Sequence, residues 1–300
     1  MPNLINVSDF ALASTVECGQ AFRWSRTADC WFEGVVGRRV IRVRQHPNSI
    51  EWESLPSGDK KVVMRYLALD VSLPEILATF PNDPLLRRAV KDHHGLRVIR
   101  QEPWECLASF IASSSKQIVQ IRQIVGLLSR RFGELVNDTH HTFPTVSAVA
   151  HATHQQLWDC KLGFRAKNLL AAARVIESGK LDLEALPSMQ YEQALEELIK
   201  LPGVGEKIAN CTLLFACGFN QAFPIDVWIE RALRRIYFDD KPGVKARELR
   251  EFARTHFGPY AGWAQQYLFF SERTRSLPNR PAPDAPTRRR ASKSELVENS

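Results

Sequence analysis

The chain has 300 residues, 44% of them hydrophobic, and a formal net charge of +7. This length allows two or three small folded units, and the positive charge suits a polyanion partner without proving one. No run of about eighteen apolar residues occurs, and residues 1–14 lack the basic and apolar segments of a secretory signal, so we expect neither a membrane span nor export. Six cysteines without paired spacing fit reduced thiols in a cytosolic or nuclear protein.

The N-terminal part of the chain is predicted to form an antiparallel β-sheet. Short aromatic or β-branched segments, separated by turn residues, are typical of strands. Three such segments span 21–24, 31–36 and 39–44. In the third, Ile41 and Val43 share one face. Arginines occupy the other face, which favours a sheet with one solvated side. Gly19, just before the first segment, fits a simple turn residue on this evidence alone.

From about Lys61 the hydrophobic periodicity becomes helical. We expect helices over 103–112, 118–132, 144–160, 165–178, 188–200, 206–217 and 228–238, and another from about 260 onward. The histidines at 140, 141, 151 and 154 have no cysteine partners, so we interpret them as solvated side chains and not as metal ligands. Residues 277–300 are rich in proline and charge and are predicted to be a disordered tail.

A tight turn and the helix that follows it carry the strongest functional signal. The sequence Leu-Pro-Gly-Val-Gly at 201–205 separates two helical segments. Gly203 and Gly205 permit a positive φ and the close approach of another backbone. The unpaired N–H groups that begin the next helix can bind an anion such as a DNA phosphate. Lys207 lies in that first turn, where the helix dipole and burial would ease loss of its proton and make the amine a nucleophile. Cys211 follows one turn later on the same face.

A second polar residue precedes the helix expected at 228–238. Asp226 stands after Phe-Pro-Ile, and a helix N-terminus stabilises a carboxylate, so it should stay ionised and could face a developing cation. In the last helix, Gln265 and Phe269 are four residues apart and share a face. Each feature also has a plainer interpretation. A first-turn lysine is usually solvated, an aspartate before a helix is usually an N-cap, and such an apolar-polar pair usually belongs to the core.

Five short motifs occur in order along the chain: Gly-Gln-Ala-Phe-Arg-Trp at 19–24, Gln-Glu-Pro-Trp-Glu-Cys at 101–106, Leu-Gly-Phe-Arg-Ala-Lys at 162–167, the hairpin 201–207 with Asp226 after it, and Gly-Pro-Tyr-Ala-Gly-Trp-Ala-Gln at 258–265. Together they resemble the 8-oxoguanine DNA glycosylase/lyase branch of the helix–hairpin–helix Gly/Pro/Asp (HhH-GPD) superfamily. The resemblance runs from about residue 16 to residue 276. It implies an α+β fold, with a twisted antiparallel sheet domain (TBP-like) over 1–100. Two mostly helical subdomains over 101–276 would hold the active cleft between them.

The resemblance also implies how the cleft works. Lys207 would attack the sugar, and Asp226 would stabilise the positive charge that develops there. Phe269 would stack on the extruded base, and Gln265 would read its Watson–Crick edge, because a glutamine amide can accept from N1–H and donate to O6. Oxidation at C8 turns guanine N7 from an acceptor into a donor, and the carbonyl of Gly19 would accept that hydrogen. Leaving such buried groups unpaired costs about 1–3 kcal/mol, which supports selectivity for the lesion.

Contacts with the rest of the duplex are implied as well. The residues at the matching DNA-binding positions are Ser115, Phe164, Arg165, Gly203, Gly205 and Trp228, and Cys211 falls among the base-recognition residues. Phe164 matches an aromatic wedge that props open the duplex, and Arg165 matches an arginine that contacts the orphaned cytosine. Three positions depart from the family pattern. Ser115 replaces an asparagine, Gln120 replaces a second cytosine-reading arginine, and Trp228 replaces a residue that is often histidine. These departures concern opposite-base preference and phosphate contacts.

Two other functions fit parts of this pattern. A sister glycosylase would act on alkylated purines or oxidised pyrimidines, but Lys207 counts against the first, and the scattered cysteines count against the branches that hold an iron–sulfur cluster. A non-catalytic module that only grips DNA needs neither Asp226 nor the pair of Gln265 and Phe269. The resemblance therefore implies a monomer that acts on double-stranded DNA containing oxidised guanine, preferably opposite cytosine, by Schiff-base chemistry and β-elimination. It implies no metal, other cofactor or membrane, and a location in the bacterial cytoplasm or nucleoid, or in a eukaryotic nucleus.

Overall fold

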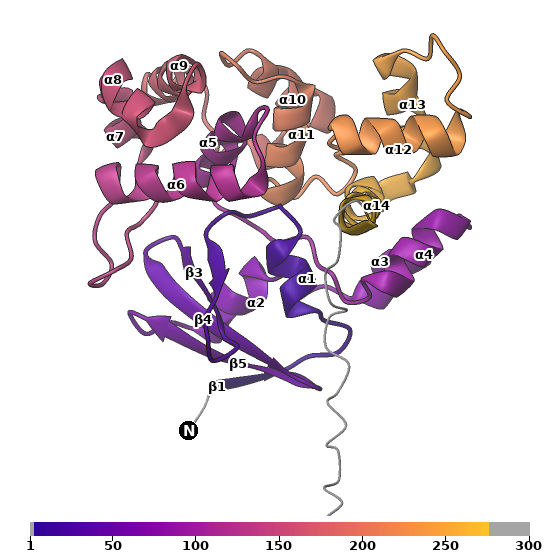
Figure 1. The fold of residues 1–300 in the computed structure, drawn as a ribbon, viewed down its shortest axis with the longest axis horizontal. Helices are drawn as coiled ribbons and strands as arrows, with labels where there is room; N and C mark the ends of the chain where they lie inside the picture. The colour runs from indigo at the N-terminus through magenta and orange to yellow at the C-terminus, as the bar shows by residue number, and fades with distance from the viewer. Residues whose placement is uncertain (1–2, 276–300) are drawn as a thin grey trace, which may run out of the picture.

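The computed structural model describes residues 3–275, and the tail predicted at 277–300 lies outside them. A five-stranded antiparallel sheet with the order β1-β5-β4-β3-β2 forms the N-terminal part (Figure 1). Its strands are β1 (Asn3–Asn6), β2 (Trp24–Arg26), β3 (Phe32–Val36), β4 (Arg39–His46) and β5 (Ser49–Leu55). Ile41 and Val43 are buried on β4, while Arg42 and Arg44 lie over the ring of Trp31. The predicted alternation along this strand is therefore confirmed.

The segment 21–24, expected as a strand, mostly precedes β2, which begins at Trp24. Side chains hold this part of the backbone in place of a β-ladder. The Gln101 carboxamide donates to the Gln20 carbonyl at 2.7 Å, and the Gln20 carboxamide donates to the Arg97 carbonyl, also at 2.7 Å. Because its polar groups are satisfied in this way, the chain around residue 20 forms a fixed loop at the edge of the helical region.

The N-terminal part of the chain also contains four helices: α1 (Leu12–Glu17), α2 (Lys60–Tyr66), α3 (Leu73–Ala78) and α4 (Pro84–Asp92). Val16 of α1 and Val63 of α2 pack in one hydrophobic core with strand residues such as Ile41 and Ile50. These two helices therefore complete the buried side of the sheet. Across residues 3–275, no helix is long and apolar enough to cross a membrane.

A larger core follows, built mainly from helices. Its longer elements are α5 (Pro103–Ser113), α6 (Ile118–Phe132), α9 (Arg165–Glu177), α10 (Tyr191–Ile199) and α11 (Glu206–Phe215). Leu107, Val125, Leu169 and Leu213 are among the buried side chains that join these helices into one cluster. Their boundaries agree closely with the helices predicted from hydrophobic periodicity, because the periodic apolar face is the face that the core buries.

The segment 144–160, predicted as one helix, is divided into three. Its parts are α7 (Val146–Ala150), α8 (His154–Leu157) and a π-helical turn (Trp158–Leu162). The side chains of Thr145 and Thr153 each accept a backbone N–H, so each threonine starts a helix of its own. Lys161 has a φ of 64° and turns the chain out of the last helical turn. The threonine caps therefore outweigh the continuous apolar pattern.

A third core joins the end of the chain to α4. Its other elements are α12 (Val227–Tyr237), α13 (Ala246–His256) and α14 (Ala261–Arg275). Leu86 of α4 is buried in the same cluster as Tyr267 of α14. Asp83 links the two parts, because its Oδ1 accepts the Leu86 N–H at 2.9 Å and its Oδ2 accepts the Tyr237 hydroxyl at 2.7 Å. The last helix of the predicted sheet domain, 1–100, thus packs on the C-terminal helices and not on the sheet.

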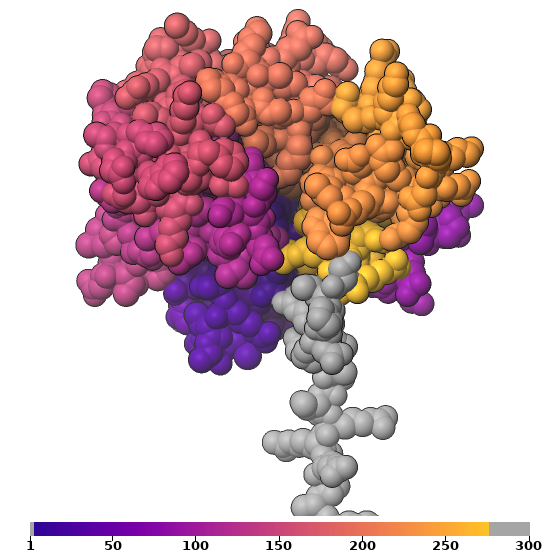
Figure 2. All heavy atoms as spheres, turned by 45° about the horizontal axis from the view of Figure 1, so that its top comes forward, coloured from indigo at the N-terminus to yellow at the C-terminus, as the bar shows by residue number. Residues whose placement is uncertain are grey.

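The second and third cores face each other across a hollow in the molecular surface (Figure 2). Residues of α5 and α6 and of the loop between them line one side of it, and residues of α11, α12 and α14 line the rest. This arrangement agrees with the prediction of a cleft between two mostly helical parts.

Candidate active site

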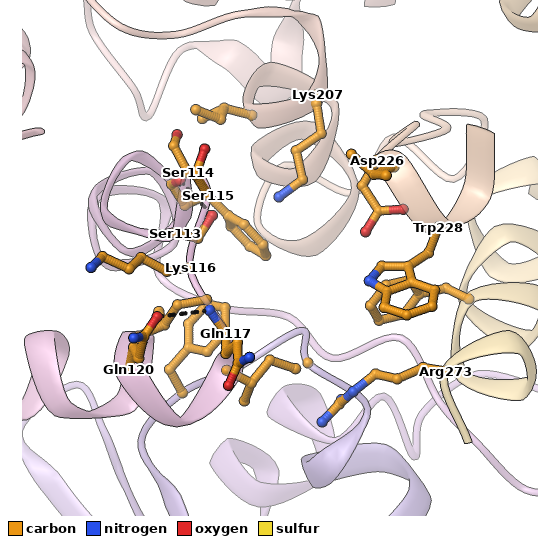
Figure 3. A pocket seen from close by; sticks show the side chains of 18 of the residues that line it. Ser113, Ser114, Ser115, Lys116, Gln117, Gln120, Lys207, Asp226, Trp228 and Arg273 are labelled. Carbon is orange, nitrogen blue, oxygen red and sulfur yellow. Dashed lines mark hydrogen bonds between the residues drawn. The ribbon is translucent and has the colours of Figure 1, made fainter. Parts of the chain in front are cut away.

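The cleft has a volume of about 950 Å³ and gathers polar groups from both helical cores. Lys207 and Asp226 point into it from α11 and from the start of α12 (Figure 3). Other residues with predicted roles that line it are Gly19, Ser115, Trp228 and Phe269. The predicted catalytic pair and the predicted base-stacking ring therefore share one cavity.

The turn before α11 uses its two glycines differently. Gly203 has a φ of +77°, and a Cβ there would lie 2.5–2.6 Å from the side chain of Asn168, so this position requires glycine. Gly205, in contrast, has a φ of −99° and no heavy atom within 4 Å of a Cβ position. Of the two properties that glycine permits here, Gly205 does not use the positive φ, and no other part of the described chain approaches it closely. It is the N-cap of α11 and makes no side-chain cap. The space in front of the helix stays open, which suits the approach of an anion.

Lys207 lies over an aromatic ring and beside a thiol. Its Nζ lies 4.7 Å from the centre of the Phe110 ring, a cation–π contact. The amine also lies close enough to the thiol of Cys211 to lower its pKa, as their shared helical face predicted. Burial raises the pKa of Cys211 to about 11, and the nearby lysine offsets this only in part. The thiol is thus protonated at neutral pH, and its neutral, polarisable surface faces the lysine.

Asp226 serves as the N-cap of α12. Its Oδ1 accepts the Ile229 N–H at 2.9 Å, which confirms the plainer interpretation of this residue without removing it from the cleft. Burial raises its pKa, while the Ile229 N–H and the charge of Lys207 lower it. The prediction that Asp226 stays ionised rested on the helix N-terminus, which favours the charged form. The structure adds a larger opposing effect, since the carboxylate is withdrawn from water.

Gly19 forms the floor of the cleft beside Phe269. It has a φ of +90°, and a Cβ would lie 2.7 Å from Cδ1 of Ile118 and 3.4 Å from Cε1 of Phe269. Both the backbone conformation and the space therefore favour glycine. Gln265 does not line the open cleft. It is only 4% exposed, and its Oε1 has no hydrogen-bond partner within the described part of the chain. A buried acceptor without a donor costs about 1–3 kcal/mol.

The serine-rich loop between α5 and α6 forms the rim of the cleft. Ser115 lines it, is exposed, and has a φ of +54°, an uncommon conformation for a residue with a side chain. Gln120 also lines the cleft, but its Oε1 accepts the Gln117 N–H at 3.2 Å in a capping box at the start of α6. The residue that replaces the expected arginine is thus engaged in holding its own helix.

Two other predicted DNA contacts lie outside the cleft lining. Phe164 is 63% exposed before α9, as a wedge would be. Arg165 is buried and turns inward. Its Nε donates to the Ser114 carbonyl at 2.6 Å, and its Nη1 donates to the Leu162 carbonyl at 3.1 Å. In this state Arg165 fixes the serine-rich loop. Trp228, 41% exposed, lines the opposite side of the cleft.

Several groups in the cleft had no predicted role there, among them Phe22, Phe110, Lys116 and Arg273. Phe22 lies in the first motif and Phe110 in an expected helix, but an apolar pattern does not separate a cleft ring from a core ring. Arg273 was detectable, because it follows Phe269 by four residues and shares its helical face. Over residues 3–275, no group of three or more His, Cys, Asp or Glu side chains is placed to hold a metal ion.

The sequence matches two family models. The first, 8-oxoguanine DNA glycosylase, N-terminal domain, covers residues 4–107, and the second, HhH-GPD superfamily base excision DNA repair protein, covers residues 108–259. The chain is 27% identical to the N-glycosylase/DNA lyase OGG1 of Arabidopsis thaliana over 90% of this chain and 80% of that protein. The apo structure of the 8-oxoguanine glycosylase/lyase of Clostridium acetobutylicum matches with a TM-score of 0.83 at 33% identity, over 90% of this chain and 98% of that one.

A second structure of the Clostridium enzyme contains double-stranded DNA with cytosine opposite 8-oxoG. It matches with a TM-score of 0.84 at 31% identity, over 92% of this chain and 99% of that one. The chain belongs to the HhH-GPD superfamily of base excision DNA repair proteins. Within that superfamily it falls in the 8-oxoguanine DNA glycosylase family, whose N-terminal domain it carries.

Proposed function

We propose that Lys207 and Asp226 carry out the reactions of this protein, which is a bifunctional DNA glycosylase and AP lyase that removes 8-oxoguanine from DNA. The observation that carries the proposal is the convergence of these two side chains on one cleft that also holds Gly19 and Phe269 (Figure 3). A non-catalytic DNA-binding module gives no reason for a lysine and a buried carboxylate to meet beside such a pocket.

The chemistry follows from this arrangement. The unprotonated amine of Lys207 attacks C1′ of the deoxyribose, and the C1′–N9 bond breaks with its electron pair passing to the base. Asp226 opposes the positive charge that develops on the sugar. The attached nitrogen then loses a proton, and the C1′–O4′ bond breaks to open the sugar ring. The product is a Schiff base between Lys207 and C1′. The Schiff base acidifies the C2′ hydrogens, and removal of one of them expels the 3′ phosphate by β-elimination.

Base recognition uses four further residues. The extruded base stacks on Phe269, and its N7–H is accepted by the carbonyl of Gly19. Normal guanine would present a lone pair to that carbonyl and lose the bond. The unpartnered Oε1 of Gln265 supports a role in reading the Watson–Crick edge, since a guanine N–H would satisfy it. The Cys211 thiol, next to Lys207, completes the site on the side of α11.

Excision is preferred opposite cytosine but is less strict than in family members that carry both cytosine-reading arginines. The support is local: Gln120 is uncharged and already caps α6, and Ser115 is shorter than an asparagine. The Clostridium relative bound to DNA with cytosine opposite 8-oxoG supports the preferred pairing. Every side chain of the site comes from one chain, which supports action as a monomer.

Borohydride trapping tests the central assignment. Reduction of the Schiff base joins the enzyme to a lesion-bearing duplex as a stable adduct that is visible on a denaturing gel. We expect Lys207→Gln to keep DNA binding and to lose the adduct. Lys200→Gln is the matched control, because Lys200 is an exposed lysine that pairs with Glu197 at the end of α10, away from the cleft. Efficient trapping by Lys207→Gln would mean that another amine is the nucleophile.

A further inference from the structure

A cationic side chain that no motif includes lies beside the predicted base-recognition residues. Arg273 is on α14, one helical turn after Phe269, and lines the same cleft as Lys207 and Asp226. Figure 3 shows its guanidinium entering the cleft below Trp228. The chemistry described above does not use it.

The guanidinium is positioned by the loop that carries Gly19. Nη1 of Arg273 donates to the Glu17 carbonyl at 3.4 Å, and it lies 3.6 Å from the Cβ position of Gly19. The donors of an arginine lie in one plane, so the hydrogen bond from Nη1 to the Glu17 carbonyl also orients the other N–H groups of the guanidinium. The side chain is partly buried, so its charge is less screened than that of a surface arginine.

The covalent structure of the lesion places an acceptor, the C8 oxygen, beside N7 and therefore near the Arg273 guanidinium. In 8-oxoguanine, C8 is bonded to N7, so the C8 oxygen lies next to the N7–H that Gly19 accepts in the proposed function. We propose that Arg273 donates a hydrogen bond to the C8 oxygen and is a specificity-determining residue. This inference rests on the proposed placement of the base against Gly19 and Phe269. Guanine carries C–H at C8 and offers no acceptor there.

The same contact strengthens as the base leaves. When the C1′–N9 bond breaks, its electron pair enters the base, and part of the negative charge spreads to the C8 oxygen. A guanidinium fixed beside that oxygen stabilises the departing anion more than the neutral ground state, so it raises the excision rate. Water then protonates the released base. The contact has no effect on attack at an abasic site, where no base is present.

The experiment compares two substrates that differ at one atom. In 8-thioguanine, N7–H is retained and sulfur, a poorer acceptor, replaces the C8 oxygen. Base release is measured under single-turnover conditions after alkaline cleavage, so that the readout does not depend on the lyase step. We expect the parent protein to prefer the oxygen substrate. Arg273→Met should slow excision of 8-oxoguanine by about 10- to 100-fold, the scale of a charge-assisted hydrogen bond, and should remove most of that preference.

The controls separate this role from two others. Arg275→Met changes an exposed arginine on the same helix, paired with Glu272, and should leave both rates unchanged. If Arg273→Met slows both substrates equally, Arg273 only holds the loop at Glu17, and the proposal is wrong. A loss of trapping at a preformed abasic site would likewise overturn it. The Lys207 assignment fails separately, through trapping by Lys207→Gln, because the substrate ratio does not depend on which amine attacks.

Discussion

The two walls of the cleft are built in different ways. On the catalytic wall, contacts within the protein hold each group in place: Asp226 caps α12, Lys207 lies over the Phe110 ring, and Gly203 packs against Asn168. The opposite wall is the loop 113–117 with the start of α6, and Arg165 of α9 supports this loop from outside the cleft lining. There Ser115 has a positive φ, Gln120 caps its own helix, and Arg165 is bonded to backbone carbonyls.

The difference shows where the site is prepared for its ligand. The catalytic wall already presents the amine of Lys207, the carboxylate of Asp226 and a glycine floor, so we expect little rearrangement there when DNA binds. Several polar groups at the opposite wall are already hydrogen-bonded within the free protein, among them Ser113, Gln120 and the Ser114 carbonyl. Any contact of Arg165 with an orphaned base must therefore replace its bond to the Ser114 carbonyl. This exchange lowers the net gain from reading the opposite base.

The largest effect is expected on the catalytic wall. Asp226→Asn keeps an oxygen to cap α12 and removes the negative charge that faces the developing cation. We expect single-turnover excision of 8-oxoguanine to slow by about 100-fold or more, the scale of a lost preorganised electrostatic contact. Equal rates for the variant and the parent would reduce Asp226 to a structural cap.

The same variant has a pH-dependent effect on stability. Burial raises the pKa of Asp226 above its unfolded value, so the folded protein binds this proton more tightly than the unfolded chain does. The cost of holding the ionised carboxylate is absent below the unfolded pKa of about 3.9 and fully present above the raised folded value. Asp226→Asn removes this cost, so its stability gain should be near zero in acid and should grow toward pH 7. Urea unfolding at both ends of this window measures the trend.

Gly19→Ala tests the floor that joins the two walls. The added Cβ would meet Ile118 at 2.7 Å in a backbone conformation that alanine rarely adopts. The carbonyl must then shift away from N7–H, and we expect excision to fall by roughly 10- to 100-fold with duplex affinity retained. Trapping at a preformed abasic site should persist, since no base is read there. An alanine variant as active as the parent would return Gly19 to the role of a turn residue.

Local sequence features predicted the catalytic wall better than the opposite wall. A glycine turn and the first residues of a helix define a position within one short segment, so the places of Lys207 and Asp226 could be predicted from spacing, and both residues line the cleft. The inward orientation of Arg165 depends on the Ser114 carbonyl, which is distant in sequence. The pKa of Asp226 depends on burial by other elements, and Arg273 gains its role only beside Gly19. None of these long-range relations is encoded in local periodicity.

The rates of excision opposite different bases test how well the opposite wall selects cytosine. A good bidentate contact is worth about 1–3 kcal/mol, and Gln120 cannot form the one that an arginine would. We expect excision opposite cytosine to be fastest, with measurable rates opposite thymine, guanine and adenine. Single-turnover cleavage of four duplexes that differ at this base gives the ratios. Strict cytosine specificity in the parent protein would show that other side chains read the orphaned base.

Gln120→Arg tests the same preference for cytosine by placing an arginine where the family pattern has one. The arginine should increase the preference for cytosine by about tenfold. It also removes the Gln120 side chain that accepts the Gln117 N–H, so part of the gain is offset at the start of α6. Gln120→Met is the control, because it removes the same Oε1 acceptor from the Gln117 N–H without adding a charge. If both variants change the ratios equally, the cap and not the arginine controls base preference.

The smallest expected effect concerns the strain stored in the loop at Ser115. With a φ of +54°, this residue occupies the left-handed region, which costs most residues about 1–2 kcal/mol and in which asparagine is enriched. Ser115→Asn should therefore stabilise the protein by about 0.5–1 kcal/mol and raise Tm by roughly 2–4 °C. Glycine would relieve the strain further but would add freedom to the unfolded chain, so its gain should be smaller. Ser114→Asn is the matched control, because Ser114 has a φ of −52° and carries no such strain. Equal melting temperatures for the two asparagine variants would mean that the loop relaxes in solution, and that the opposite wall is remodelled before DNA arrives.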